Sequence, residues 1–386
     1  MSDAPRDTEK VQTTGGVLFV SHNYGYANDL LYYGPLLNAL RGHEPDLTIA
    51  VDKRADYANP YDLPLEGLYD RRSIRLPGRG AYVRLLHLAA PGFARTVARR
   101  DFDVVVAVEF TPVTLLALSG ARRAKRVLLV ESDPRLRGGN FSPLSLAIKR
   151  RAIAAAHVVQ TNNEAGARYC VDVLRCPTDK VIVAPYLTSR PPGPVAKPTL
   201  SRAGLRLLFA NSLTERKNAG LLLDALQLLS AEVLTRVHCT VVGDGEKRAV
   251  LERKARDAGL EKHVHFVGHV PYADLGLYHA QADVLVNPTR ADYRSLASFE
   301  GLGYGLALLV SNADGAAKET VIEGRTGHSF APDDAAALAS HITHMANNPE
   351  RLLAMRRAAF RLYEERFSVE QAASNLAATI DAARRA

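Results

Sequence analysis

Short apolar runs rich in β-branched residues recur along the chain and alternate with stretches whose apolar positions follow a helical period. One such helical stretch covers 28–42 and ends in "LLNALRG". Continuous apolar strands separated by helices are typical of a parallel sheet that is covered on both faces. In the first half of the chain we predict strands at 16–20, 47–51, 103–109, 126–131, 157–160 and 180–185.

The alternation stops at 186–200, which holds four prolines and has no periodicity, and then resumes. Such a segment is typical of a linker. A helix predicted at 219–230 carries Leu222, Ala225, Leu226 and Leu229 on one face. In the second half we predict strands at 206–210, 236–243, 263–268, 282–287 and 307–311.

The pattern therefore predicts an α/β protein with two doubly wound domains that face a cleft. Ligands of such sheets bind beyond the carboxyl ends of the strands. The expected parts are a disordered tail at 1–14, a first domain at 15–190, a linker at 191–200, a second domain at 201–366, and a terminal helix at 367–386 that packs back on the first domain.

Charge is distributed unevenly between the two halves. Residues 1–200 carry 27 Lys and Arg against 19 Asp and Glu, whereas residues 201–386 carry 22 of each, so the whole net charge of +8 lies in the first half. Residues 71–100 hold eight arginines and no acid, beside apolar residues such as Leu85 and Leu86. This segment suits peripheral contact with an anionic membrane surface. A phosphate-bearing substrate or a solvated basic face remains the alternative.

Several classes of protein are disfavoured by the composition. No apolar run reaches the ~18 residues of a membrane-spanning helix, and the first residues, "MSDAPRDTEKVQTT", lack the apolar core of a signal peptide. Three sparse cysteines, Cys170, Cys176 and Cys239, favour free thiols over a zinc site. We see no nucleic-acid-binding signature. The sequence thus predicts a cytoplasmic protein, peripheral on the inner face of the membrane, without a nucleic-acid partner.

The stretch "ADYRSLASFEGLGYGLALLVSN" at 291–312 contains the most suggestive chemistry. It follows a predicted strand, so Ser295 can cap a helix whose first N–H groups belong to Leu296, Ala297 and Ser298. A helix start at the carboxyl edge of a sheet is an anion site. Glu300, one turn further, can accept hydrogen bonds from a ribose diol if a nucleotide crosses the helix end. The alternative is a salt bridge to a nearby arginine.

The spacing from Asp292 to Glu300 resembles the E-x7-E signature of family-four GT-B glycosyltransferases. The run after Glu300, "GLGYGLALLVSNADGAAKETVIEGRTGHSF", is similar to the same family, as is "VVGDGEKRAVLERKARDAGLEKHVHFVGHV" with its G-x-G loop at Gly243 and Gly245. The resemblance covers most of 205–365. It implies the GT-B fold, in which two Rossmann-like domains face a central cleft. The resemblance also implies that the domain at 15–190 binds the acceptor and that the domain at 201–366 binds the nucleotide sugar.

The resemblance also implies roles for individual residues. Glu300 resembles the ribose-binding Glu, Asp292 stands where the family contacts the donor sugar, and Lys217 matches the diphosphate-binding Lys. A cation there would stabilise charge on the leaving nucleotide. Glu131 ends a middle strand where many members have a His, so the expected catalytic residues are Asp292, Lys217 and Glu131. The remaining expected donor contacts are Ser212, Gly243, Gly268, His269, Val270, Arg294, Ser295 and Leu296.

The sequence departs from the family pattern near the donor. Asn211 and Ser212 replace a Gly-Arg pair, so one phosphate cation is missing unless Arg216 or Arg294 substitutes. The family Gly-Phe-Gly after the first acid reads Tyr293, Arg294, Ser295. In the first domain, His22 and Glu109 also end predicted strands, and the Gly-rich loop at 22–29 retains only Gly25.

The implied function is retaining transfer of a sugar from a nucleotide-diphosphate sugar to a glycan or lipid-linked acceptor, in polysaccharide, glycolipid or cell-envelope glycan synthesis. No cofactor or metal is expected, because the D-x-D motif of Asp101 and Asp103 precedes its strand instead of following it. Two alternatives stay open: a GT-B nucleotide-sugar 2-epimerase, and a non-catalytic GT-B-like partner protein.

Overall fold

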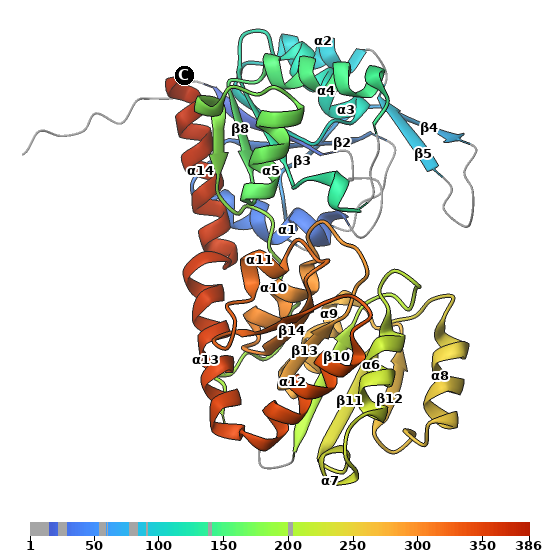
Figure 1. Cartoon of the computed structure of the whole chain (residues 1–386). Coiled ribbons are helices and arrows are strands. Elements are labelled where there is room, and N and C mark those ends of the chain that lie inside the picture. Colours follow the sequence, from blue (N-terminus) through green and yellow to red (C-terminus); the bar gives the residue numbers. More distant parts are fainter. Residues whose placement is uncertain are drawn as a thin grey trace, which may run out of the picture.

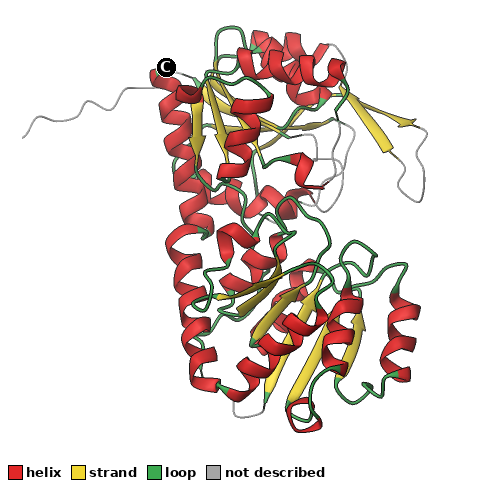
Figure 2. Cartoon of the chain, viewed as in Figure 1, coloured by secondary structure: helices red, strands yellow, loops and turns green. Residues whose placement is uncertain are grey.

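Two α/β domains lie one above the other, and a long helical segment runs alongside both (Figure 1). The computed structural model describes residues 15–21, 29–53, 59, 61–76, 84–89, 92–137, 141–199 and 204–386, without the side chains of 29–32, 71–76, 84–89 and 136–137. The prediction of two doubly wound domains is confirmed (Figure 2). The expected tail at 1–14 lies outside the described residues.

The N-terminal domain contains a parallel sheet in the order β3–β2–β1–β6–β7–β8–β9. Its strands are β1 (Gly16–Val20), β2 (Leu47–Asp52), β3 (Leu65–Tyr69), β6 (Phe102–Val108), β7 (Lys125–Val130), β8 (Val158–Thr161) and β9 (Val181–Val183). Its helices are α1 (Asp29–Leu40), α2 (Gly92–Arg99), α3 (Pro112–Gly120), α4 (Pro143–Ala155) and α5 (Glu164–Arg168).

The C-terminal domain has a second parallel sheet in the order β12–β11–β10–β13–β14–β15. Its strands are β10 (Leu205–Ala210), β11 (Val237–Val242), β12 (Val264–Gly268), β13 (Val284–Asn287), β14 (Ala307–Ser311) and β15 (Gly327–Phe330). The helices are α6 (Ala219–Gln227), α7 (Ala231–Leu234), α8 (Arg248–Asp257), α9 (Tyr272–Gln281), α10 (Leu296–Gly303), α11 (Ala317–Thr320), α12 (Ala335–Asn347), α13 (Pro349–Arg366) and α14 (Val369–Arg385).

All the predicted strands are found, but four strands were not predicted. β3 and β15 contain Gly and charged or polar residues in place of a β-branched run. The other two, β4 (Arg71–Leu76) and β5 (Arg84–Ala89), form an antiparallel hairpin inside the arginine-rich segment. The hairpin projects away from the body of the N-terminal domain (Figure 1).

The strand order of each sheet reverses once, between β1 and β6 and between β10 and β13. Loops that leave two neighbouring strands in opposite directions open a crevice at their carboxyl ends. In the C-terminal domain these loops are 211–218 and 288–295, which contain the expected donor residues Ser212, Lys217, Asp292, Arg294 and Ser295. In the N-terminal domain the loop after β1 lies largely outside the described residues, including His22 and Gly25.

The chain crosses between the domains a second time after α13. That helix packs on the C-terminal core through Ala359, Leu362 and Tyr363. By contrast, α14 packs on the N-terminal sheet and α1, where Leu376 and Ile380 are fully buried. Arg384 near its end forms ion pairs with Glu44 at 2.8 Å and Asp103 at 2.9 Å. Residues 369–385 are therefore part of the N-terminal domain in space.

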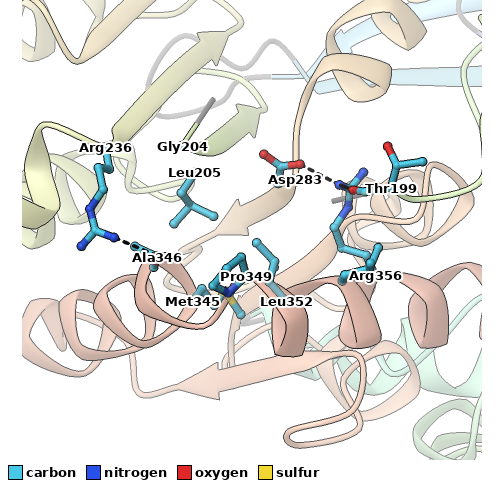
Figure 3. Close-up of a pocket in the computed structure, with 11 residues that line it drawn as sticks. Thr199, Gly204, Leu205, Arg236, Asp283, Met345, Ala346, Pro349, Leu352 and Arg356 are labelled. Carbon is cyan, nitrogen blue, oxygen red and sulfur yellow. Dashed lines mark hydrogen bonds and ion pairs between the residues drawn. The ribbon is translucent and has the colours of Figure 1, made fainter. Parts of the chain in front are cut away.

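A small cavity of about 180 Å³ lies at the amino end of the C-terminal sheet, between β10 and the helices α12 and α13 (Figure 3). Beside it, the fully buried Asp283 accepts from Arg206 Nη2 at 2.9 Å and Arg356 Nη1 at 2.7 Å. This ion-pair triad joins the start of β13 to α13. Because it lies at the amino ends of the strands, its role is structural.

Candidate active site

A cavity of about 330 Å³ opens at the crevice between the loops that follow β10 and β13. Its walls come from β10, from the loop that contains Lys217, and from the start of α10. The lining residues are Ala210, Asn211, Lys217, Asp292, Tyr293, Arg294, Ser295, Leu296, Ala297 and Glu300. The structure thus brings six of the expected site residues together at the switch point of the C-terminal sheet.

Lys217 and Asp292 form a buried ion pair in this cavity. Lys217 Nζ lies 2.9 Å from Asp292 Oδ2, and both side chains are 8% exposed. Arg216 Nη1 donates to the same oxygen at 2.6 Å. Burial acts to raise the pKa of Asp292, but Lys217 and Arg216 hold it below its usual range. Two cations on one carboxylate leave an excess of positive charge where a diphosphate would lie.

Close backbone contacts position the loop that carries Lys217. Gly243 has φ 134°, and a Cβ there would lie 2.0 Å from the carbonyl oxygen of Asn211. A Cβ on Gly245 would lie 2.5 Å from the carbonyl oxygen of Leu213. Only glycine allows these approaches. The role of Gly243 is therefore to let the loops after β10 and β11 pack against each other.

Glu300 is buried near the start of α10. Its Oε1 accepts from Ser189 Oγ at 3.1 Å, and His279 Nε2 lies 3.9 Å from Oε2. Burial raises the pKa of Glu300 to about 7 and lowers that of His279 to about 4, so the imidazole is neutral at pH 7. Among the described residues no arginine pairs with Glu300, which removes the alternative of an arginine salt bridge. The carboxylate can therefore accept hydrogen bonds from a ligand.

The start of α10 differs in detail from the expectation. Ser295 is the N-cap residue, but its side chain makes no capping hydrogen bond. Its backbone N–H donates instead to Asp314 Oδ1 at 3.1 Å, and the N–H of Ala316 donates to the same atom at 3.0 Å. Asp314 also accepts from Asn287. An internal carboxylate thus fixes the turn, and the helix that begins at Leu296 borders the cavity.

Arg294 does not provide the missing phosphate cation. Its side chain is 1% exposed, and its Nε donates to Glu319 at 3.0 Å. It also donates to the carbonyl oxygen of Leu187 and lies over the ring of Phe299 at 4.0 Å. Of the two residues considered as substitutes for the absent arginine, Arg294 is therefore already engaged, because its donors bind protein groups. Arg216 is the second cation at the cavity.

A carboxylate of the N-terminal domain meets the cavity from the opposite side. Glu131, just after β7, accepts from Tyr33 at 2.7 Å and from Tyr293 at 3.0 Å. Its backbone N–H donates to Glu109 Oε1 at 2.7 Å. Burial and, after it, the charge of Glu131 raise the pKa of Glu109 to about 8. Because Tyr293 comes from the C-terminal domain, this hydrogen bond links the two domains across the cleft.

Sequence reasoning did not assign roles to Tyr33 and Tyr293 at Glu131. A signal existed for Tyr293, since a tyrosine stands where the family has glycine. The sequence contained no signal for Tyr33, because this residue lies in a helical segment beside another tyrosine.

The other expected residues lie around the cavity without lining it. Ser212 is exposed in the loop after β10. Gly268 ends β12 with φ 91°, followed by an exposed His269 and a half-buried Val270, at the same end of the sheet. Of the D-x-D pair, Asp103 binds Arg384.

A family profile matches the part of the chain that forms this site. The glycosyl transferases group 1 profile covers residues 197–362, which include Lys217, Asp292 and Glu300. The C-terminal domain belongs to the glycosyl transferases group 1 family. The match begins in the linker and ends near the end of α13.

Known proteins resemble this chain in sequence and in fold. The GDP-mannose-dependent alpha-(1-6)-phosphatidylinositol monomannoside mannosyltransferase of Mycolicibacterium smegmatis is 32% identical over 37% of this chain and 39% of its own length. The alpha-monoglucosyldiacylglycerol synthase of Acholeplasma laidlawii is 30% identical over 29% of this chain and 27% of its own length. The chain thus spans well under half the length of these relatives.

A solved structure extends the resemblance to both domains. Anabaena HepE in complex with UDP superposes with a TM-score of 0.71 at 17% identity, covering 95% of this chain and all of HepE. At this identity the likeness shows the fold, and it confirms the GT-B arrangement of the two domains.

Nucleotide binding to the group 1 domain should strengthen about tenfold between pH 6 and pH 8. Burial raises the pKa of Glu300 to about 7. The ionised carboxylate, which accepts hydrogen bonds from ribose hydroxyls, is therefore scarce at pH 6 and dominant at pH 8. Calorimetric titration with UDP or GDP across this range measures the effect. Glu300→Gln is the control, because it removes the titrating carboxyl group. The pH dependence that remains in this variant comes from titration of the diphosphate. If the affinity of the wild type changed with pH in the same way as that of Glu300→Gln, the assignment of Glu300 as the ribose-binding carboxylate would be contradicted.

Proposed function

We propose that this chain is a retaining glycosyltransferase that moves a sugar from a nucleotide-diphosphate sugar to an acceptor. The observation that carries the proposal is the Lys217–Arg216–Asp292 cluster, with Glu300, in the switch-point cavity of a group 1 domain. A cation and a buried carboxylate that line one cavity at the switch point of a parallel sheet suit the diphosphate and the ribose of a nucleotide.

In this proposal the protein acts by binding, orientation and charge stabilisation. Lys217 and Arg216 stabilise the negative charge that develops on the leaving diphosphate. Glu300 holds the ribose, and Asp292 is oriented by its two cations toward the donor sugar. No metal is invoked, because the side chains supply the positive charge. The acceptor oxygen attacks from the face of the leaving group, and the leaving phosphate takes its proton, so no protein nucleophile is needed.

Glu131 would act from the N-terminal side of the cleft. Tyr33 and Tyr293 donate to its two oxygens, which fixes the carboxylate, and the bond from Tyr293 links the two domains. Closure excludes water and aligns the acceptor with the anomeric carbon. We assign Glu131 to orienting the sugar or the acceptor hydroxyl.

A lipid-linked acceptor at a membrane surface is the substrate class that we favour. The names of two relatives describe glycolipids. In this chain, α4 exposes Leu144 (71%) and Ile148 (43%) one turn apart, with exposed Arg150 and Arg151 after them. Such a face, near a projecting arginine-rich hairpin, suits peripheral contact with an anionic bilayer. Across the described residues, no helix has the length and apolarity to cross a membrane.

A thermal-shift panel of UDP, GDP, ADP and TDP on wild type and Glu300→Ala tests the function. One diphosphate at about 100 times its dissociation constant should stabilise the wild type by about 2.7 kcal/mol. Glu300→Ala should lose this shift, and the corresponding sugar nucleotides are then assayed for transfer. If no diphosphate stabilises the folded wild type, the chain is a non-catalytic partner. Epimerisation of the donor without an acceptor would identify the 2-epimerase alternative instead.

A further inference from the structure

Glu109 follows β6 in a backbone conformation that residues with side chains rarely adopt. Its φ is 58°, in the left-handed region that favours glycine. Such a conformation costs free energy, and it persists only where the surrounding contacts impose it. β6 is the middle strand of the N-terminal sheet, so Glu109 lies at the carboxyl edge, beside Glu131 at the end of β7. Glu109 has no part in the proposed function.

The backbone of Glu109 leaves the β6–β7 ladder at this residue. Its N–H still donates to the carbonyl oxygen of Leu129 at 2.9 Å, as in a parallel pair of strands. Its own carbonyl oxygen accepts from Thr114 Oγ1 of α3 at 2.9 Å. Thr114 also forms the capping box of α3 with Thr111. The start of α3 therefore holds Glu109 in its left-handed conformation.

The side chain of Glu109 takes the place of that carbonyl oxygen in the ladder. If the parallel ladder continued, the N–H of Glu131 would donate to the backbone oxygen of Glu109. It donates instead to Glu109 Oε1 at 2.7 Å. The carboxylate of Glu131 then accepts from Tyr33 and from Tyr293 of the other domain. The point at which Glu131 leaves the sheet is thus set by a side chain and not by the backbone of β6.

The carboxyl group of Glu109 is mostly protonated at pH 7. Burial and, after it, the charge of Glu131 raise its pKa to about 8, although the hydrogen bond from Glu131 and the charge of Lys149 act to lower it. A neutral carboxyl can accept from the N–H of Glu131 without placing a second full negative charge beside that residue. Glutamine has the shape and the charge of this neutral form.

A purely structural hydrogen bond at the end of a strand is the simpler explanation. However, a residue in the ordinary extended conformation would supply the same bond from its backbone carbonyl, without strain. Stability of the sheet alone therefore does not account for a left-handed glutamate here. Residues in strained conformations cluster at active sites, where they hold a neighbouring group in one arrangement.

We propose that Glu109 is a positioning residue, which acts through the backbone of Glu131 to aim that carboxylate at the donor sugar or the acceptor hydroxyl. The proposal rests on the role of Glu131 in the proposed function and deepens it. Glu109 then needs no contact with either substrate, and its effect on the reaction depends on the presence of Glu131.

The kinetics of sugar transfer by Glu109→Ala and Glu109→Gln test this role. We expect Glu109→Ala to lower kcat about 10- to 100-fold, because a displacement of about 1 Å at a reacting group costs up to about 10²-fold. KM for the donor should stay within about twofold, since the cavity that holds the nucleotide is lined by the other domain. Glu109→Gln should recover most of the kcat, because its Oε1 can accept from the same N–H.

Arg175→Ala is the matched control for the change to alanine at a left-handed residue. Arg175 is an exposed residue of the same domain, has φ 65°, and lies before β9, at the opposite edge of the sheet from Glu131. Its kcat should equal that of the wild type. An unchanged nucleotide-induced thermal shift shows that each variant is folded.

The double variant Glu109→Ala/Glu131→Ala separates positioning from a direct contact with substrate. If Glu109 acts only through Glu131, the double variant should match Glu131→Ala in kcat within about twofold. Losses that multiply would show that Glu109 acts independently, and they would overturn the proposal. A wild-type kcat in Glu109→Ala, or equal losses in Glu109→Ala and Glu109→Gln, would overturn it as well.

Hydrogen exchange at the Glu131 amide gives a readout that needs no turnover. It should be faster in Glu109→Ala than in the wild type, and unchanged in Glu109→Gln. If the wild type transfers sugar but the amide exchanges equally in all three proteins, only the positioning role is overturned. If the wild type transfers no sugar with any donor, the proposed function fails and the role of Glu109 fails with it.

Discussion

Replacing Lys217 by methionine should lower the rate of sugar transfer by about 10²- to 10³-fold. The ammonium group lies buried beside Asp292, where it needs no reorganisation to meet the charge that develops on the leaving diphosphate. Methionine keeps most of the side-chain volume, and Arg216 still pairs with Asp292. The protein should therefore fold while losing one preorganised positive charge at the reacting phosphate.

Release of nucleoside diphosphate at saturating donor and acceptor measures this loss. Lys254→Met is a suitable control, because Lys254 is a half-exposed lysine of the same domain that pairs with Asp224 at 2.6 Å, away from the cavity. Its rate should stay within about twofold of wild type. If Lys217→Met retained the wild-type rate, the diphosphate would have to bind elsewhere.

Replacing Asp283 by alanine should destabilise the C-terminal domain by about 3–5 kcal/mol. Asp283 is fully buried between Arg206 and Arg356. Burial lowers the pKa of Arg356, which shows how unfavourable the charged guanidinium is there, although Asp283 opposes that shift. Without the carboxylate, a buried charge is left uncompensated. A side chain that connects β13 to α13 is lost at the same time.

Urea unfolding followed by circular dichroism measures this destabilisation. Asp224→Ala provides the comparison, since it breaks the half-exposed ion pair with Lys254 and should cost at most about 1 kcal/mol. A similar small loss for Asp283→Ala would mean that the triad is solvated and contributes little. Nucleotide binding by the folded Asp283→Ala protein should persist, because the triad lies at the opposite end of the sheet from the donor cavity.

Strands that are buried on both faces could be predicted, because burial selects runs of β-branched residues. Strands without such a run could not. Strands such as "VVVAV" in β6 are buried on both faces, so their apolar sequence identifies them. The β4–β5 hairpin contains arginines beside apolar residues, and we interpreted this segment by its charge, so its strands were not predicted. β15 is only four residues long, "GHSF", and it exists because β14 offers an edge to pair with.

The candidate site was predictable as a set of residue types but not as a set of contacts. Family spacing indicated Lys217, Asp292 and Glu300. From the sequence, Arg294 is a cation that could bind a phosphate. In the structure it donates to Glu319, 25 residues later in the chain. That glutamate also accepts from Asn163 of the other domain at 2.7 Å. Partners separated by more than 150 residues depend on how the domains meet, which no local pattern encodes.

The placement of α14 has a consequence for biosynthesis. One face of the N-terminal sheet is covered in part by residues 369–385, with Ala373, Leu376 and Ile380 fully buried against it. During translation, the first domain therefore emerges from the ribosome with an apolar surface still open. Folding cannot proceed strictly from the first domain to the second, as it does in many multidomain chains. The nascent chain must shield that surface, with a chaperone or with transient contacts of its own, until the entire second domain has been made.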